Sequence, residues 1–149
     1  MASQSPNPNQ RRPAGGQPGQ IRPGVTHAVI SQADLLASFA SMLGVEIPAC
    51  DSENMFDALV GKDGFGRDFL YAESPAGGRV LREGKWLSIE PSDESPFDIM
   101  TQTETAASRD PQLYNLDYDI GEVKNLADRH PDIIEKMAAK MDSITNRKF

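Results

Sequence analysis

The stretch PQLYNLDYDIGEVKNLADRHPD, residues 111–132, places a strand, a turn and a helix start in one short run. Leu113, Tyr114 and Leu116 predict a short strand, because aromatic and apolar residues in this arrangement fit a half-buried pleated surface. A turn rich in Asp and Gly follows, and Pro131 suits the first turn of a helix, where its missing N–H needs no partner. The stretch therefore predicts a compact strand, turn and helix unit.

The acidic residues of the predicted turn raise the question of a metal site. An EF-hand calcium loop needs oxygen ligands at alternate positions, Gly at the sixth and Glu at the twelfth. Counting from Asp117, Asp119 falls third and Asp128 twelfth, but Gly121 comes fifth and Glu122 takes the sixth place. We therefore expect these acids to shape a turn in which Gly accepts a positive φ, rather than to bind calcium.

Length and charge suit one soluble domain with a modest core, since the 149 residues carry a net charge of −7. Residues 1–24 contain no acid and three bases, Arg11, Arg12 and Arg22, so all 22 acidic residues lie in the remainder. A surface this acidic repels phosphate backbones, which argues against a nucleic-acid partner. One cysteine excludes an internal disulfide framework, and we expect Cys50 to be a small, partly buried thiol.

The N-terminal segment is low in complexity. Five prolines and four glycines with almost no apolar side chain predict a disordered tail over residues 1–24. No apolar run is long enough for a membrane helix, and the start of the chain lacks the apolar core of a secretory signal. The sequence as written therefore predicts a cytoplasmic protein without a membrane partner.

Helical periodicity begins after an extended entry or short strand at residues 25–30. Apolar residues recur at three- and four-residue steps at Leu35, Phe39, Met42 and Leu43. Ser31 followed by Asp34 resembles a capping box, and Gly44 is placed to end this helix. A second, shorter helix is expected within residues 52–62, ending at Gly61.

The middle of the chain predicts strands. Residues 68–74 fit one strand, and residues 77–90 fit a hairpin that turns at Glu83-Gly84-Lys85. Residues 91–110 are polar and without pattern, which predicts a loop. The last helix, over residues 131–144, carries an apolar stripe of Ile134, Met137, Met141 and Ile144 that must cover a face of the sheet. The fold expected is α+β, a small antiparallel sheet of three or four strands covered by a C-terminal helix.

Four segments together resemble the C-terminal region of a bacterial arylsulfatase. They are PGVTHAVISQADLLASFASMLGVEIP at 23–48, LYAE at 70–73, VLREGKWLSI at 80–89 and the run at 111–132. The order and spacing are similar to those of the formylglycine-dependent sulfatases of the alkaline-phosphatase-like superfamily. Two residues depart from the family pattern, since Ile120 stands in place of Pro and Leu87 in place of Lys.

The resemblance implies a domain organisation. Residues 1–24 are expected to be the tail, residues 25–62 an end segment of the large α/β sulfatase domain, and residues 63–149 the C-terminal subdomain. The first predicted helix would then be left over from the large domain. The loops at 74–78 and 91–110 are the expected candidates for the rim of a substrate pocket.

The family's chemistry is expected to lie outside this chain. Sulfatases of this type use calcium and a formylglycine made from Cys or Ser in a Cys/Ser-x-Pro-x-Arg motif. Cys50 is followed by Ser52 and Asn54 where that motif requires Pro and Arg. His27 and His130 are expected to have capping or solvent roles. We therefore expect no catalytic, cofactor-binding or metal-binding residue here, so that enzyme activity of the chain alone stays uncertain.

Two functional hypotheses follow. The first is a fragment of an arylsulfatase, a sulfuric ester hydrolase, that is inactive alone and whose partner is the missing catalytic domain. Intact members of that family are often exported. The second is a stand-alone, non-catalytic interaction module derived from a sulfatase.

Overall fold

The computed structural model describes residues 24–62, 64–74, 78–105 and 107–146. The chain divides into two units, Met1–Gly66 and Arg67–Phe149, and each is described by itself. The disordered tail predicted for residues 1–24 lies almost wholly outside the described residues. The domain boundaries expected from the sequence, after residues 24 and 62, stay predictions.

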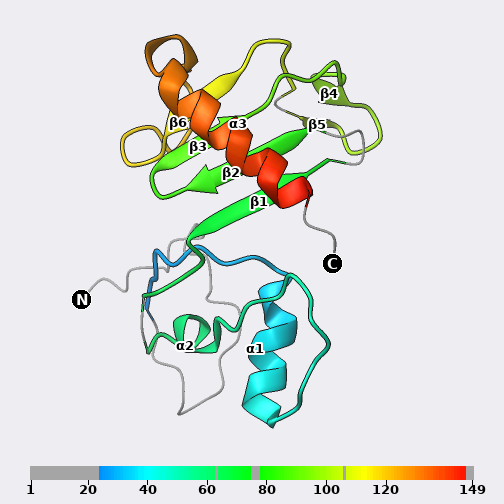
Figure 1. The fold of residues 1–149 in the computed structure, drawn as a ribbon, viewed down its shortest axis with the longest axis vertical. Helices are drawn as coiled ribbons and strands as arrows, with labels where there is room; N and C mark the ends of the chain where they lie inside the picture. Colours follow the sequence, from blue (N-terminus) through cyan, green and yellow to red (C-terminus); the bar gives the residue numbers. More distant parts are fainter. Residues whose placement is uncertain (1–23, 63, 75–77, 106, 147–149) are drawn as a thin grey trace, which may run out of the picture. The chain divides into compact units, whose positions relative to one another are not determined.

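The described residues of the first unit form two helices, α1 (Asp34–Leu43) and α2 (Phe56–Leu59) (Figure 1). Gly44 ends α1 in the left-handed conformation with φ of 67°, as the sequence predicts. Residues 25–30 form no strand, so only the alternative of an extended entry agrees with the structure. This segment passes close to Gly66, where a Cβ would lie 2.4 Å from the backbone nitrogen of Val29.

The second unit is built on a four-stranded antiparallel sheet with the order β1-β2-β3-β6. Its strands are β1 (Phe69–Glu73), β2 (Arg79–Glu83), β3 (Trp86–Ile89) and β6 (Gln112–Asn115). The turn between β2 and β3 contains Gly84 with φ of 56°, a conformation that glycine adopts without steric cost. The predicted fold class is confirmed.

One face of this sheet is covered by α3 (Pro131–Thr145), which runs across the strands in Figure 1. Leu81 and Leu113 point to this face and are fully buried, and Met137 and Met141 of α3 are each 1% exposed. Partly buried apolar residues surround them, namely Phe69, Tyr71, Trp86, Ile133, Ile134 and Ile144. The apolar stripe predicted for the last helix is confirmed as core.

The segment at 91–110 contains structure that the sequence did not predict. A two-stranded ribbon forms from β4 (Phe97–Asp98) and β5 (Thr103–Glu104). Asp98 nucleates its turn, because its Oδ1 accepts the backbone N–H of Met100 at 2.8 Å and of Thr101 at 3.3 Å. The loop prediction was therefore wrong here, because local side-chain bonds build a turn without any apolar alternation to announce it.

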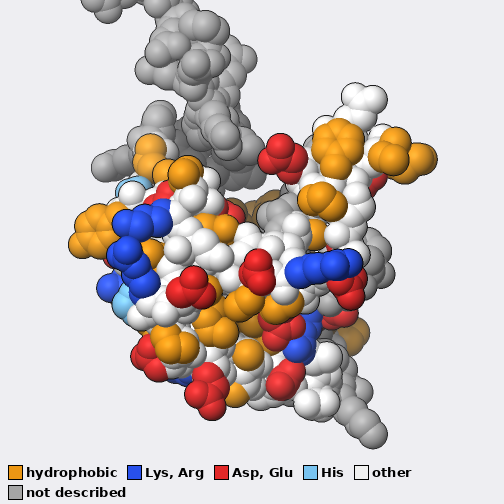
Figure 2. Space-filling view, turned by 90° about the horizontal axis from the view of Figure 1, so that it is seen from above, with side chains coloured by type: hydrophobic (Ala, Val, Ile, Leu, Met, Phe, Trp, Pro, Cys, Tyr) orange, Lys and Arg blue, Asp and Glu red, His pale blue; other side chains and the backbone are white. Residues whose placement is uncertain are grey.

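The ribbon also exposes apolar side chains. Ile99 is 81% and Met100 is 92% exposed. Figure 2 shows hydrophobic side chains standing out on the right-hand side, where Figure 1 places the ribbon, while acidic and basic side chains are spread over the rest of this face. No helix within the described ranges is long and apolar enough to cross a membrane.

The buried leucine of the central strand β2 provides a test of this core. Leu81→Ala removes a fully buried side chain and should lower the free energy of unfolding by about 2–5 kcal/mol, measured by urea denaturation. Val123→Ala is the control, because this side chain is 87% exposed and its loss should change stability by less than about 0.5 kcal/mol. Equal effects of the two substitutions would contradict the assignment of the core.

Candidate functional site

The acidic turn after β6 is held by one carboxylate. Asp119 Oδ2 accepts the backbone N–H of Lys124 at 2.7 Å, and its Oδ1 accepts that of Val123 at 3.0 Å. These two bonds, the one from Lys124 first, lower the pKa of Asp119 below its ordinary value. Both carboxylate oxygens of Asp119 are therefore engaged in folding the chain.

The backbone of the turn differs in detail from the expected one. The left-handed residue is Glu122, with φ of 54°, and not Gly121. Beyond it, Asn125 Oδ1 accepts the N–H groups of Leu113 at 3.0 Å and Ala127 at 2.9 Å. One amide thus ties the outer edge of β6 to the short 3-10 helix η1 (Ala127–Arg129) that precedes α3.

A calcium site finds no matching ligand set in the part of the chain that the structure describes. No three His, Cys, Asp or Glu side chains come together there in a way that could hold a metal ion. Calcium takes six to eight oxygen ligands, and the turn offers carboxylates that are exposed or already bonded to backbone N–H groups.

The cysteine and the histidines lie apart from one another in the chain. Cys50 is exposed in the irregular segment between α1 and α2, so the prediction of a partly buried thiol was wrong. His27 is exposed. His130 precedes α3 without a capping bond from its side chain, and its ring lies 5.3 Å from that of Trp86. Packing against an indole, rather than capping, is the contact that His130 makes.

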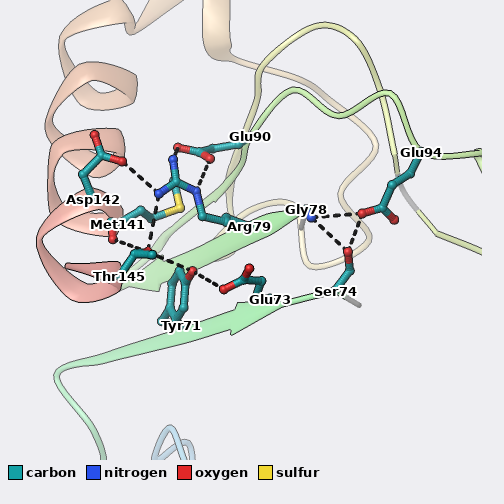
Figure 3. A network of polar contacts seen from close by, with 10 residues as sticks. All are labelled: Tyr71, Glu73, Ser74, Gly78, Arg79, Glu90, Glu94, Met141, Asp142 and Thr145. Atoms are coloured by element: carbon teal, nitrogen blue, oxygen red, sulfur yellow. Dashed lines mark hydrogen bonds and ion pairs between the residues drawn. The ribbon is translucent and has the colours of Figure 1, made fainter. Parts of the chain in front are cut away.

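A hollow of about 170 Å³ lies where the two predicted rim loops meet. Glu94 Oε1 accepts the backbone N–H of Gly78 at 2.9 Å and the hydroxyl of Ser74, as Figure 3 shows. A Cβ at position 78 would lie 2.9 Å from the same Oε1, so this close approach suits glycine. The apolar floor of the hollow includes Val80 and Ile89. Its polar wall is acidic.

Beside the hollow, Arg79 joins the sheet to α3 (Figure 3). Its guanidinium donates to Glu90 at 2.5 and 2.8 Å and to Asp142 of α3 at 2.8 Å. These contacts, that to Asp142 first, raise the pKa of Arg79 above its ordinary value. The bidentate pair with Glu90 fixes the orientation of the guanidinium, and the single bond to Asp142 joins it to α3.

In the first unit, the polar side of α1 is pinned by the segment that follows it. Ser52 Oγ accepts the N–H of Ala37 at 2.8 Å and donates to the carbonyl of Ala33 at 2.7 Å, which inserts its hydroxyl into the helical ladder. The fully buried carboxylate of Asp34 accepts the N–H groups of Ser31 at 2.8 Å and Glu53 at 2.9 Å. The bond from Ser31 to Asp34 is one half of the capping box that the sequence predicts. The other half does not form, because α1 has Ala33 as its N-cap and Ser31 Oγ accepts the N–H of Ala33 at 3.2 Å.

The apolar side of α1 is exposed. Phe39 is 49%, Met42 is 46% and Leu43 is 69% exposed, and these residues belong to the apolar stripe that the sequence predicts for this helix. The polar residues Asp34 and Ser38 are fully buried instead. The apolar side chains of α1 are therefore exposed while its polar side is buried.

Comparison with known proteins shows that the chain is similar to sulfatases. An N-acetylgalactosamine-6-O-sulfatase of Bacteroides thetaiotaomicron is 32% identical over 133 residues, covering 87% of this chain and 26% of that protein. Human arylsulfatase A is 28% identical over 138 residues, and the match covers 80% of this chain and 27% of the human protein. A solved structure described as BT33336S-sulf comes from work on glycosaminoglycan metabolism by Bacteroides thetaiotaomicron. It is 30% identical in sequence and superposes with a TM-score of 0.78, and the match covers 86% of this chain and 27% of that chain. No family model matches the chain.

The chain is a homologue of sulfatases and corresponds to the C-terminal part of these relatives. It spans about a quarter of their length. The resemblance inferred from the four sequence segments is therefore confirmed.

Sequence reasoning missed two contacts that shape these surfaces. Ser52 and Glu94 each act across a long stretch of chain, and neither belongs to a motif that predicts its partner. For the contact made by Ser52, the one available signal was the polar segment at residues 50–54 between two apolar helices. The loops at 74–78 and 91–110 were named only through the resemblance, as candidates for the rim of a substrate pocket.

The turn at Asp119 predicts a pH-dependent stability. Because the pKa of Asp119 is lower in the folded chain, its stabilisation is present above the unfolded value, about 4, and is lost as pH falls through the folded value. Asp119→Ala should lower Tm at pH 7, and the difference from wild type should shrink below about pH 4. Asp117→Ala is the matched control, since that exposed carboxylate accepts no hydrogen bond from the described residues. A Tm difference for Asp119→Ala that persists at low pH would contradict this role.

Proposed function

We propose that this chain acts as the non-catalytic C-terminal subdomain of a sulfuric ester hydrolase and is inactive alone. The observation that carries the proposal is the exposed apolar face of α1. The opposite, polar side of this helix is held by the hydrogen bonds of Ser52 and Asp34. The relatives supply the context, because they are sulfatases about four times as long as the matched region. The apolar face would contact the preceding part of such an enzyme.

Within that arrangement the two units have different roles. α1 provides the apolar contact, and the hollow at Ser74, Gly78 and Glu94 contributes to the rim of a cleft for sulfated saccharides. The calcium ion and the formylglycine that the resemblance implies would belong to the preceding part. This chain's own residues contribute shape and position, and no proton or bond transfer is assigned to them.

Reconstitution tests the proposal. The purified chain should release no product from 4-nitrophenyl sulfate with calcium present. Co-expression with the part of the Bacteroides thetaiotaomicron N-acetylgalactosamine-6-O-sulfatase that precedes the matched region should yield a complex that hydrolyses the ester. Hydrolysis by this chain alone, or a preceding part that is fully active without it, would contradict the proposal.

A dye-binding experiment addresses α1 directly. The isolated chain should enhance the fluorescence of a hydrophobic dye, because the exposed face of α1 is contiguous and apolar. Leu36→Asp should reduce that signal several-fold, whereas Gln32→Asp adds the same charge just outside the helix and should not. A compact monomer that leaves the dye dark would favour a stand-alone interaction module instead.

A further inference from the structure

Strand β2 carries two arginines on opposite faces of the sheet. Side chains alternate along a strand, so Arg79 and Leu81 share the face that α3 covers, while Val80 and Arg82 share the other. Arg79 is fully paired, because Glu90 and Asp142 both accept bonds from its guanidinium. The same strand therefore provides an internal comparison for Arg82.

Among the described residues, Arg82 has no such partner. Its side chain is half-buried, and its Nε is buried without a hydrogen-bond acceptor. Within the described part of the chain, no carboxylate, carbonyl or hydroxyl oxygen accepts a bond from its guanidinium. In the sheet register, Arg82 lies between Leu70 of β1 and Leu87 of β3, with Tyr114 of β6 next in line. These neighbours contribute apolar surface or, in Tyr114, a hydroxyl that already donates to Gln112.

A half-buried guanidinium without an acceptor is unfavourable. Arginine keeps its charge at any physiological pH, so it cannot escape the cost of desolvation by losing a proton. Buried polar groups in folded proteins nearly always have a hydrogen-bond partner, and an orphan donor costs more than an exposed one. An acceptor from outside the described residues is therefore expected.

The rest of this chain offers little to supply it. Residues 1–23 contain no acid, and outside the described ranges the only acidic side chain is that of Asp63. The hollow beside Val80 has the carboxylate of Glu94 in its wall and is not lined by Arg82, so it offers no oxyanion site for this guanidinium. An apolar setting with one bidentate donor suits a carboxylate carried by a protein surface.

We propose that Arg82 anchors the face of β2 opposite α3 to an Asp or Glu in the part of a sulfatase that precedes this region. The inference rests on the proposed function and adds a second contact of different chemistry to the apolar face of α1. Arg82 then has outside the described residues the kind of carboxylate partner that Arg79 has within them. It is a positioning residue and touches no reacting atom.

Two measurements test the proposal. The first is thermal unfolding of the isolated chain. Arg82→Met should leave Tm unchanged or raise it, because an unpaired cation is replaced by an apolar side chain of similar length. Arg79→Met is the matched control and should lower Tm by several degrees through loss of its bonds to Glu90 and Asp142.

The second measurement is binding. The chain is titrated into the purified preceding part of the Bacteroides thetaiotaomicron N-acetylgalactosamine-6-O-sulfatase by calorimetry. Arg82→Met should raise Kd at least 10-fold, Arg82→Lys should raise it less, and Asp63→Asn should leave it unchanged.

The outcomes separate this inference from the proposed function. If the wild-type chain does not bind, both fail. If it binds and Arg82→Met binds equally well, the inference fails and the proposed function stands. A loss of Tm in Arg82→Met or Asp63→Asn as large as that in Arg79→Met would show an internal partner and overturn the inference. Stabilisation of wild type, but not of Arg82→Met, by sodium sulfate would assign Arg82 to a free oxyanion and also overturn it.

Discussion

The burial of Leu81 and Leu113 beneath Met137 and Met141 is the packing on which the second unit depends. A four-stranded sheet of such short strands needs an apolar cover to be stable, and α3 supplies it. That cover also brings Asp142 to Arg79, so the ion pairs at the edge are a consequence of the helix position. The position of α3 also depends on the hydrogen bonds of Asp119 and Asn125, which shape the segment that connects β6 to η1.

The first unit is organised in the opposite way. Its helix α1 is held from the polar side, by Asp34, Ser38 and Ser52, and its apolar side is left in solvent. Hydrogen bonds of this kind give geometry rather than large net stability, because they replace bonds to water. An apolar face presented in this way fits a helix whose stability comes from packing against something else. Homology to proteins about four times as long agrees with that interpretation.

Much of this could be predicted from the sequence, and the reasons are physical. The stripe at Ile134, Met137, Met141 and Ile144 has the period of a helix, and the turn at Gly84 has the residues of a hairpin, so both were predictable. The β4–β5 ribbon was not, because it depends on Asp98 bonding its own turn and lacks apolar alternation. The burial of Asp34 and Ser38 was not either, since a helical stripe identifies the apolar face and not the hydrogen bonds that hold the polar face. The sequence does not distinguish Arg82 from an ordinary arginine in a strand, because its apolar neighbours are identified only by the register of the sheet.

Hydrogen exchange of α1, measured by mass spectrometry in the isolated chain and in complex with the preceding part of the Bacteroides sulfatase, tests the central claim most directly. The account predicts that amides of Asp34–Leu43 exchange at least 10-fold more slowly in the complex, because the exposed apolar face becomes packed. The turn at residues 117–124 serves as the internal reference and should exchange at the same rate in both. Equal exchange of α1 in the two samples would contradict the claim that this helix face is a docking surface.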